Sequence, residues 1–303
     1  MRAIVTGASG FVGRNLTEGL LEAGHEVTAL VRSLDRVPRD WVGRVDTVCL
    51  DLEHIRELGQ MLSPGYDAWF HLGWAGTSGS LRGDVALQLS NVGWACAAAE
   101  TAANLGCGRF VYAGSIMEYE AKVYLRETGS RPGAGYIYST AKLCADLMLR
   151  TVCFARGIGY IHGVISNIYG AGEVSSRFLN ATLRKLLRHE HVACTEGKQL
   201  YDFIYVSDAV RKLVFLGEAG TPGEDYYIGN PEPRPLREFI LTMRQISESR
   251  SELGFGEVPF NSPNLDYSQF DPGKLERLGC RNLFSFEDGV RKTMEWLRDV
   301  NEQ

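Results

Sequence analysis

Apolar runs and helical patterns alternate along the first half of the chain. Short apolar runs predict strands at residues 3–5, 27–31, 45–50, 68–72, 110–113 and 160–168. Between them, apolar positions at helical spacing predict a helix through Leu16 and Leu20 and two long helices at residues 84–105 and 137–156. Strands that alternate with helices form a parallel sheet covered on both faces. The pattern therefore predicts an α/β fold with a doubly wound parallel sheet.

The pattern becomes irregular after Gly170. Helices are shorter there, and prolines crowd the last third of the chain, at Pro222, Pro231, Pro233, Pro235, Pro259, Pro263 and Pro272. We expect residues 1–170 to form the cofactor-binding domain, with residues 200–228 returning to it. Residues 171–303 are expected to form mainly a smaller, irregular substrate-binding domain beyond the carboxyl edge of the sheet.

A glycine-rich turn follows the first predicted strand. Gly7 allows a tight turn, Gly10 lets the backbone approach a pyrophosphate, and Gly13 lets the next helix pack close to the sheet. The free N–H groups at the start of that helix would face the anion. Such a turn alone is a weak signal, but its place directly after a strand indicates a Rossmann-type dinucleotide site. The residues predicted to contact the cofactor here are Gly7, Ser9, Gly10, Phe11, Val12 and Gly13.

The end of the second predicted strand favours NADP over NAD. An acidic residue there would hold the ribose 2′-OH of NAD, but Arg32 stands in this region and can pair with a 2′-phosphate. The alternative is a solvated surface arginine. We interpret His71, at the fourth strand's end, as structural. The other residues expected beside the cofactor follow the third and fourth strands: Asp51, Leu52, Leu72, Gly73 and Trp74.

The candidate chemistry lies in Ser115, Tyr138 and Lys142. Ser115 ends the fifth predicted strand, and Tyr138 and Lys142 share one helix face because they are four residues apart. A nearby ammonium favours the phenolate and lowers the pKa of the tyrosine, which can then exchange a proton with a carbinol or carbonyl oxygen. The Ser115 hydroxyl can hold the same oxygen. A tyrosine and a lysine four residues apart are common by chance. The prediction therefore depends on finding them together with the N-terminal glycine turn and a serine at a strand end.

Composition and charge limit the classes of binding partner and the cellular location that we expect. The net charge of -5 and the absence of a basic run argue against nucleic acid. No apolar stretch reaches membrane-spanning length, and the chain enters a strand at once, so we expect neither a membrane segment nor a signal peptide. The seven cysteines form no Cys-x-x-Cys pair, which is typical of reduced thiols in the cytoplasm. The histidines show no metal-ligand spacing, and His189 with His191 is better explained by a solvated helix end.

At these residues the chain resembles the extended short-chain dehydrogenase/reductase family, in the NAD-dependent epimerase/dehydratase branch that acts on nucleotide sugars. The matching segments are Thr6-Gly7-Ala8-Ser9-Gly10-Phe11-Val12-Gly13, Arg109-Phe110-Val111-Tyr112-Ala113-Gly114-Ser115, Tyr138-Ser139-Thr140-Ala141-Lys142, Asn167-Ile168-Tyr169-Gly170 and Asp202-Phe203-Ile204-Tyr205-Val206-Ser207-Asp208. The resemblance implies hydride transfer at a sugar carbon with Tyr138 as acid/base. It also implies that Lys142 binds the nicotinamide ribose, that Ile165 lies near the nicotinamide, and that Asn167 lies near the sugar or its phosphates.

Departures from the family pattern narrow the expected activity. Dehydratases of the family carry an Asp-Glu pair where Ile116 and Met117 stand here, and the fucose-synthase type carries Cys at the place of Met117. The segment through Glu118 looks most like 4-keto-deoxysugar reductases of the abequose/paratose synthase type. The arginine usual before Asp202 is replaced by Tyr201, so Arg177 or Arg184 is the candidate to hold the diphosphate; alternatively, both are surface arginines. The expected substrate contacts are Ser115, Glu118, Asn167, Arg177 and Tyr201.

These observations lead us to expect an NADPH-dependent reductase of a nucleotide-linked 4-keto-6-deoxysugar. One alternative is a nucleotide-sugar 4-epimerase that retains NAD, and another is a non-catalytic NADP-sensing protein on the same fold.

The two long helices at residues 84–105 and 137–156 predict a homodimer. Both are apolar around most of their surface, so one face can pack on the sheet while the other needs a partner. In the alternative, the C-terminal domain covers these faces and the protein is a monomer.

Overall fold

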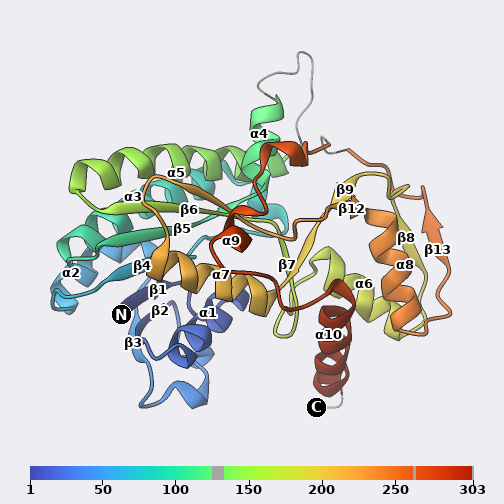
Figure 1. Cartoon of the computed structure of the whole chain (residues 1–303), viewed down its shortest axis with the longest axis horizontal. Coiled ribbons are helices and arrows are strands. Elements are labelled where there is room, and N and C mark those ends of the chain that lie inside the picture. The colour runs from blue at the N-terminus through green and yellow to red at the C-terminus, as the bar shows by residue number, and fades with distance from the viewer. Residues whose placement is uncertain (125–132, 262–263, 302–303) are drawn as a thin grey trace. The chain divides into compact units, whose positions relative to one another are not determined.

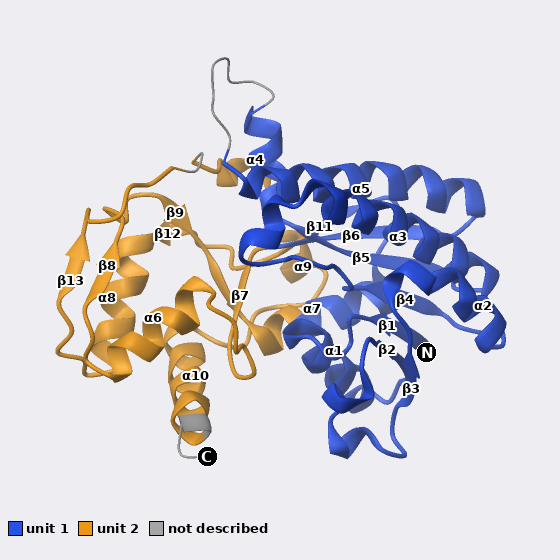
Figure 2. Ribbon diagram, turned by 180° about the vertical axis from the view of Figure 1, so that it is seen from behind, with its two compact units in different colours: residues 1–165, 210–226 blue, residues 166–209, 227–303 orange. Residues whose placement is uncertain are grey.

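The computed structural model describes residues 1–124, 133–261 and 264–301 (Figure 1). The chain divides into two compact units, coloured separately in Figure 2. The first contains Met1–Ile165 and Val210–Tyr226, and the second contains Ser166–Ala209 and Tyr227–Gln303. The chain thus leaves the first unit at residue 165 rather than at residue 170, and the segment that returns is shorter than the expected 200–228.

A seven-stranded sheet forms the centre of the first unit, in the order β3-β2-β1-β4-β5-β6-β11. Its strands are β1 (Arg2–Thr6), β2 (Glu26–Val31), β3 (Asp46–Cys49), β4 (Ala68–His71), β5 (Arg109–Ser115), β6 (Gly159–Ile165) and β11 (Asp225–Ile228). The sheet is parallel, and its order reverses beside β1, which pairs with β2 on one side and β4 on the other. The predicted doubly wound, Rossmann-type fold is confirmed. A ligand crevice lies at such a reversal, outside the carboxyl ends of the strands.

Helices cover both faces of this sheet (Figure 1). The helices of this unit are α1 (Phe11–Glu22), α2 (Leu58–Met61), α3 (Val85–Asn104), α4 (Met117–Tyr124), α5 (Gly135–Arg156) and α7 (Val206–Ala219), whose first turn precedes the unit's boundary. Trp69 and Phe110 from the strands join Ala98 of α3 and Leu149 of α5 in one buried apolar core. On the other face, Gly19 of α1 lies against α7. Helix α4 was not predicted from the sequence.

One predicted strand, residues 160–168, was wrong as a single element. It breaks at Ser166, whose N–H donates to Ile228 O (3.0 Å). Beyond the break, β7 (Asn167–Tyr169) pairs with β10 (Phe203–Tyr205) in a separate two-stranded sheet. The apolar run is continuous, so only the change of pairing partner ends the first strand.

The second unit consists of short ladders and helices. Its other strands are β8 (Val192–Cys194), β9 (Leu200–Tyr201), β12 (Arg234–Pro235) and β13 (Leu253–Phe255), and its helices are α6 (Phe178–Leu187), α8 (Leu236–Ile246), α9 (Lys274–Arg277) and α10 (Phe286–Asn301). An aromatic cluster holds it together: the Phe239 ring lies 4.9 Å from that of Phe203 and 4.7 Å from that of Phe286, centroid to centroid. Among the described residues, no helix combines the length and apolarity needed to cross a membrane.

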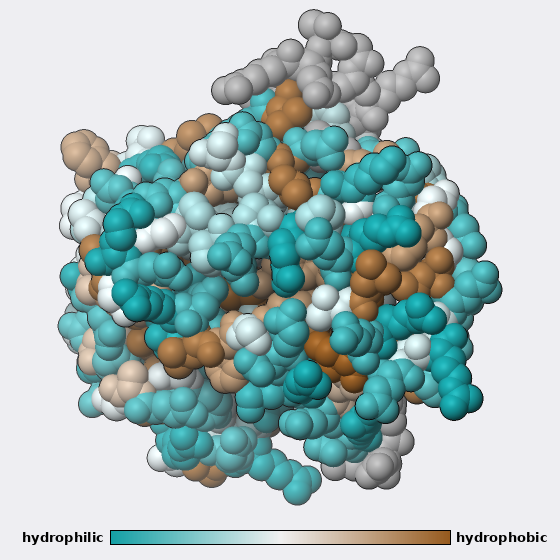
Figure 3. All heavy atoms as spheres, turned by 45° about the vertical axis from the view of Figure 1, so that its right-hand side comes forward, coloured by the Kyte–Doolittle hydropathy of each residue, from teal (hydrophilic) through white to brown (hydrophobic). Residues whose placement is uncertain are grey.

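Apolar side chains also reach the surface of α3 and α5. Val85 and Leu89 of α3 are 54% and 61% exposed, and Leu147 and Phe154 of α5 are 58% and 88% exposed. On the molecular face shown in Figure 3, apolar side chains form separate patches between hydrophilic ones. The exposed positions on the two helices are therefore available to a partner chain.

Candidate active site

The glycine turn between β1 and α1 is shaped by close backbone contacts. Gly7 has φ +72°, in the left-handed region, and its carbonyl accepts the N–H of Gly10 at 3.0 Å. A Cβ on Gly13 would lie 2.1 Å from the Gly7 oxygen, so the helix can pack here only without a side chain. These contacts give a physical reason for glycine at both positions.

The start of α1 fits an anion. Gly10 is the N-cap and offers no side-chain acceptor to the first N–H groups of the helix. At the neighbouring strand end, the Gly73 N–H donates to Thr6 Oγ1 at 3.3 Å, and a Cβ on Gly7 would lie 2.9 Å from Gly73 N. A turn that brings bare backbone and uncapped N–H groups together is suited to a pyrophosphate. The residues present therefore fit the phosphate part of a dinucleotide.

Residues around this turn have defined local roles. Arg32 is exposed directly after β2, and it makes no ion pair within the described ranges. Asp51 caps a 3₁₀ helix (Leu52–Glu57) by accepting the Leu52 N–H at 2.7 Å. His71 is buried against Thr6 Oγ1 (3.0 Å), and burial, with the nearby charge of Lys142, lowers its pKa to about 3. His71 is therefore neutral, which agrees with the structural role expected for it.

The three predicted chemical residues all lie in the first unit. Ser115 is the last residue of β5, and its Oγ accepts the N–H of Met117 at 3.2 Å. Tyr138 and Lys142 lie on α5, and both are buried. Trp74 contacts both: its ring meets that of Tyr138 edge-on, with centroids 6.3 Å apart, and Lys142 Nζ lies 4.0 Å from its centroid. The helix spacing thus brings the tyrosine and the lysine to one indole ring.

Lys142 lies in an environment that disfavours its charge. Its Nζ donates to Ala113 O at 2.8 Å, and no carboxylate pairs with it directly among the described residues. Burial lowers the pKa of Lys142 to about 7, although the charge of Glu118 acts in the opposite direction. Lys142 therefore exchanges its proton near neutral pH, which suits a group that tunes an acid/base tyrosine.

Arg82, which no sequence pattern predicted as a site residue, lies over the Tyr138 ring. Its guanidinium carbon is 4.7 Å from the ring centroid. Its Nε and Nη2 are buried and have no hydrogen-bond partner in the described part of the chain. Burial raises the pKa of nearby Glu120 to about 7, and Arg82 opposes this rise. Arg82 comes from a 3₁₀ turn (Ser80–Gly83), so no periodic signal in the sequence pointed to it.

Glu118 is buried rather than placed to contact a substrate. Its side chain accepts the Ser115 N–H at 2.8 Å, and its other oxygen lies 3.1 Å from His162 Nε2. Ligand atoms of Glu118, Asp146 and His162 lie within 4.8 Å of one another, a spacing that could also hold a metal ion. Arg150 supplies positive charge to the cluster through Asp146 (3.0 Å). Ion pairing within the protein thus explains the cluster, and the expected role of Glu118 in substrate contact does not fit its burial.

The remaining predicted substrate residues belong to the second unit. Asn167 Nδ2 donates to Asp202 O at 3.1 Å, and the Tyr201 ring stacks on Phe203 with centroids 5.9 Å apart. Arg177 is exposed and lies 3.6 Å from a Glu173 carboxylate oxygen. The alternative candidate, Arg184, donates to the Ser175 and Glu173 carbonyls at 3.0 and 2.8 Å. Arg184 thus holds a loop, which leaves Arg177 as the better candidate for the diphosphate.

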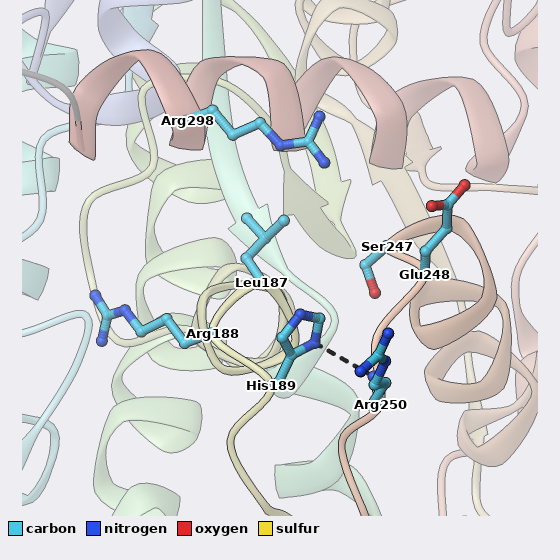
Figure 4. A pocket seen from close by; sticks show the side chains of 7 residues that line it. All are labelled: Leu187, Arg188, His189, Ser247, Glu248, Arg250 and Arg298. Carbon is cyan, nitrogen blue, oxygen red and sulfur yellow. Dashed lines mark hydrogen bonds between the residues drawn. The ribbon is translucent and has the colours of Figure 1, made fainter.

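A pocket of about 600 Å³ lies elsewhere in the second unit (Figure 4). It is lined by Leu187, Arg188, His189, Ser247, Glu248, Arg250 and Arg298, none of which is a predicted site residue. His189 and Glu248 have φ of 58° and 52° because each lies just past the end of a helix, α6 and α8 respectively. Cations near the carboxyl ends of helices have a structural explanation. The pocket therefore shares no lining residue with the candidate active site.

Comparison with known proteins decides the family. A family model described as the NAD dependent epimerase/dehydratase family matches residues 3–229. The chain belongs to this family. It is 24% identical over 298 residues to the CDP-abequose synthase of Salmonella muenchen, covering 97% of each chain. It is 22% identical to the UDP-N-acetyl-alpha-D-glucosaminuronate decarboxylase of Bacillus cytotoxicus, covering 99% of this chain and 98% of that one.

Solved structures of other proteins share the fold. The UDP-glucose 4-epimerase of Thermotoga maritima, solved with UDP-glucose, aligns with a TM-score of 0.81 at 18% identity, over 99% of this chain and 100% of that one. The UDP-glucuronic acid 4-epimerase of Bacillus cereus, in complex with NAD, aligns with a TM-score of 0.80 at 18% identity, over 100% of this chain and 98% of that one. At this identity the likeness shows the fold alone. The two similar proteins named above are a synthase and a decarboxylase, and the family description names epimerases and dehydratases, so the family by itself leaves the reaction open.

Proposed function

We propose that this protein reduces the 4-keto group of a nucleotide-linked 4-keto-6-deoxysugar with NADPH. The observation that carries the proposal is the environment of Ser115. Its oxygen accepts the Met117 N–H, so its own hydroxyl proton is available for a carbonyl oxygen. The next two residues, buried Ile116 and half-buried Met117, have no ionisable group to remove or add a proton beside that carbonyl. This combination favours simple ketone reduction over elimination of water.

The cofactor would bind along the carboxyl edge of the sheet. Its proposed contacts are the glycine-turn residues Gly7, Ser9, Gly10, Phe11, Val12 and Gly13, with Arg32, Asp51, Leu52, Leu72, Gly73, Trp74, Tyr138, Lys142 and Ile165. Arg32 would pair with the 2′-phosphate, because an exposed arginine stands where an NAD-specific site would carry an acid. The NAD named with several solved relatives makes NAD the alternative cofactor.

The protein's own groups would then handle the carbonyl oxygen. When bound, NADPH supplies the hydride that reduces the keto carbon. The Ser115 hydroxyl donates a hydrogen bond to the keto oxygen and orients it. Tyr138 gives its phenolic proton to that oxygen as negative charge develops there, and Lys142 stabilises the phenolate that remains. Asn167, Arg177 and Tyr201 stay proposed substrate contacts.

The second candidate is a nucleotide-sugar 4-epimerase that retains its nicotinamide cofactor. The description of the matching family, which names epimerases, favours it. An epimerase would return the hydride and show no net consumption of cofactor.

A panel of nucleotide-linked keto sugars tests the proposal. NADPH oxidation is followed by absorbance, with NADH alongside, and the products are separated by chromatography. Stoichiometric NADPH consumption with a 4-keto-6-deoxysugar supports the reductase. Interconversion of 4-epimers without net oxidation would replace it with the epimerase, and loss of carbon dioxide from a uronic acid would replace it with a decarboxylase. Nucleotide binding without turnover on the whole panel would favour an NADP-sensing protein.

We also propose a cytoplasmic homodimer built on α3 and α5. Leu147, Met148 and Phe154 project from α5, and Val85 and Leu89 from α3, all at least 49% exposed. A two-fold partner that offers the same helices would cover this apolar surface. The reduced state of the seven cysteines suits the cytoplasm.

A further inference from the structure

Ser115 and Glu118 form a reciprocal capping pair at the start of α4. Glu118 Oε1 accepts the Ser115 N–H at 2.8 Å, while Ser115 Oγ accepts the Met117 N–H at 3.2 Å. A Ser-x-x-Glu arrangement of this kind satisfies two helix-start donors at once. The bonds fix both the backbone and the hydroxyl oxygen of Ser115. A purely structural interpretation would stop at this helix cap.

The burial of Glu118 goes beyond what a helix cap needs. A capping glutamate at a helix start can stay in water, but Glu118 is 0% exposed. A buried carboxylate is costly unless a cation compensates it. His162 of β6 supplies this compensation, because its Nε2 lies 3.1 Å from Glu118 Oε2 and it is 2% exposed. The two atoms are not aligned for a hydrogen bond, so the contact acts mainly through charge.

The other ring nitrogen of His162 faces two more carboxylates. Its Nδ1 lies 3.1 Å from Asp225 Oδ1 of β11 and 3.4 Å from Asp146 Oδ1 of α5. Arg150 of α5 pairs with both of these carboxylates. Among the described residues, the charged groups that surround His162, including Glu118 of α4, are therefore three acids and one arginine. This excess of negative charge favours the imidazolium.

The ring environment and the pKa agree with a charged histidine. Tyr112 and Tyr160 stack against the imidazole, with centroids 5.8 and 6.3 Å away. Burial alone would lower the pKa of His162, but the charge of Glu118 and the hydrogen bond with Asp225 outweigh it and raise the pKa to about 9. His162 thus stays charged at neutral pH and loses its charge as the pH rises through about 9.

The backbone beside Ser115 is fitted to this pair. A Cβ on Gly114 would lie 2.1 Å from His162 Nε2 and 3.0 Å from Glu118 Oε1. The strand residue before Ser115 therefore lies directly against both members of the pair. Any shift of His162 or Glu118 is transmitted to the end of β5.

We propose that Glu118 and His162 act as a buried positioning pair that holds Ser115 in place for the substrate carbonyl. Glu118 anchors the Ser115 N–H, and the charge of His162 holds the Glu118 carboxylate in place. Because the Met117 N–H occupies one lone pair of Ser115 Oγ, the hydroxyl is left to donate its proton to the keto oxygen of a bound substrate. This inference rests on the proposed role of Ser115 in ketone reduction.

Kinetics of pair variants test the proposal. His162→Gln should lower kcat about tenfold or more with a smaller change in KM, since misplacement of an orienting group costs mainly turnover. Glu118→Gln keeps the acceptor oxygen and should retain more activity than Glu118→Ala. In the wild type, kcat should fall as the pH rises through about 9. Asp225→Asn should move this fall to lower pH, and His162→Gln should remove it. Unchanged pH profiles in both variants would overturn the proposal.

A control separates positioning from general stability. Asp208 of the second unit is 1% exposed and accepts the N–H groups of Leu283 and Phe284 at 2.8 and 3.0 Å. Asp208→Asn therefore removes an equally buried carboxylate of the other unit, one that accepts backbone N–H groups far from Ser115 in the sequence. It should lower the melting temperature without moving the alkaline fall in kcat. An equal movement of that fall in Asp208→Asn would also overturn the proposal.

A second readout needs no turnover. In the protein without substrate, the backbone amide resonance of Ser115 should titrate with the imidazole of His162, near pH 9. Asp225→Asn should lower both midpoints together. If the enzyme reduces the keto sugar but the Ser115 amide resonance does not change as His162 titrates, the positioning pair is refuted and the proposed reductase activity stands. An inactive protein with coupled titration would refute the reductase and leave the coupling in place.

Discussion

Replacing Lys142 with methionine should stabilise the protein while it abolishes turnover. Lys142 is 5% exposed, and its ammonium touches no carboxylate among the described residues. Its compensation comes from the Ala113 carbonyl and from the rings of Trp74 and Tyr112, which lie 4.0 and 4.7 Å away. A methionine of similar length would fill the space without a charge. A lysine kept in this position at a cost indicates that function, rather than stability, requires it.

The magnitude follows from the pKa. Burial lowers the pKa of Lys142 from 10.5 to about 7, and one pKa unit corresponds to about 1.4 kcal/mol. The charge thus costs on the order of 5 kcal/mol at low pH. The variant loses the bond to Ala113 O, worth about 2 kcal/mol, and the ring contacts, worth about 1 kcal/mol. We therefore expect Lys142→Met to raise the free energy of unfolding by about 2 kcal/mol at pH 6.

The pH dependence gives the sharper test. Between pH 7 and 10.5 the unfolded chain keeps the lysine proton that the folded chain has released, so raising the pH stabilises the wild type. The methionine variant lacks this gain. The free energy of unfolding of the variant should exceed that of the wild type most below pH 7. Above pH 7 this excess should shrink by up to about 1.4 kcal/mol per pH unit. Urea unfolding at pH 6, 8 and 9.5 measures it.

Lys185→Met provides the matched control, because Lys185 of α6 is exposed. The free energy of unfolding of Lys185→Met should stay close to that of the wild type and should not change relative to it with pH. If Lys142→Met is less stable than the wild type at pH 6, or if its difference does not change with pH, burial does not penalise the Lys142 charge and the reasoning fails.

Four further variants test other parts of the site and assembly. Tyr138→Phe should lower turnover about a hundredfold or more while NADPH binding by fluorescence is kept, because it removes only the general acid; near-normal turnover would exclude Tyr138 from the mechanism. Arg32→Ala should raise the KM for NADPH much more than that for NADH, and equal changes would mean that Arg32 does not bind the 2′-phosphate. Leu147→Glu should split the dimer in sedimentation, whereas a wild type that is monomeric at micromolar concentration would defeat the assembly proposal outright. Gly13→Ala should lower the melting temperature and NADPH affinity together, since its Cβ would meet the Gly7 oxygen at 2.1 Å; unchanged values would show that the turn can relax.

Local patterns in the sequence determined the parallel sheet, the glycine turn and the pairing of Tyr138 with Lys142 on one helix face. Each depends on residues a few positions apart, so helix or strand periodicity is enough to predict it. The same periodicity indicated two apolar long helices, but it did not separate inward from outward positions. Leu149 is buried in the core, while Leu147, two residues earlier on the same helix, is exposed. Packing against the sheet decides this, because the apolar residues surround most of the helix.

Tertiary structure alone decided the surroundings of the chemical residues. The sheet order places β6 beside β5, and only that neighbourhood brings His162 to Glu118 and turns an expected substrate contact into a buried ion pair. Arg82 reaches Tyr138 from a turn without periodicity. The strand break at Ser166 depends on which neighbour its backbone pairs with. Where folding removes water, buried charges and backbone polar groups need partners, and these partners come from segments far apart in the chain. Which groups become partners therefore depends on the packing of the sheet and cannot be predicted from a short stretch of sequence.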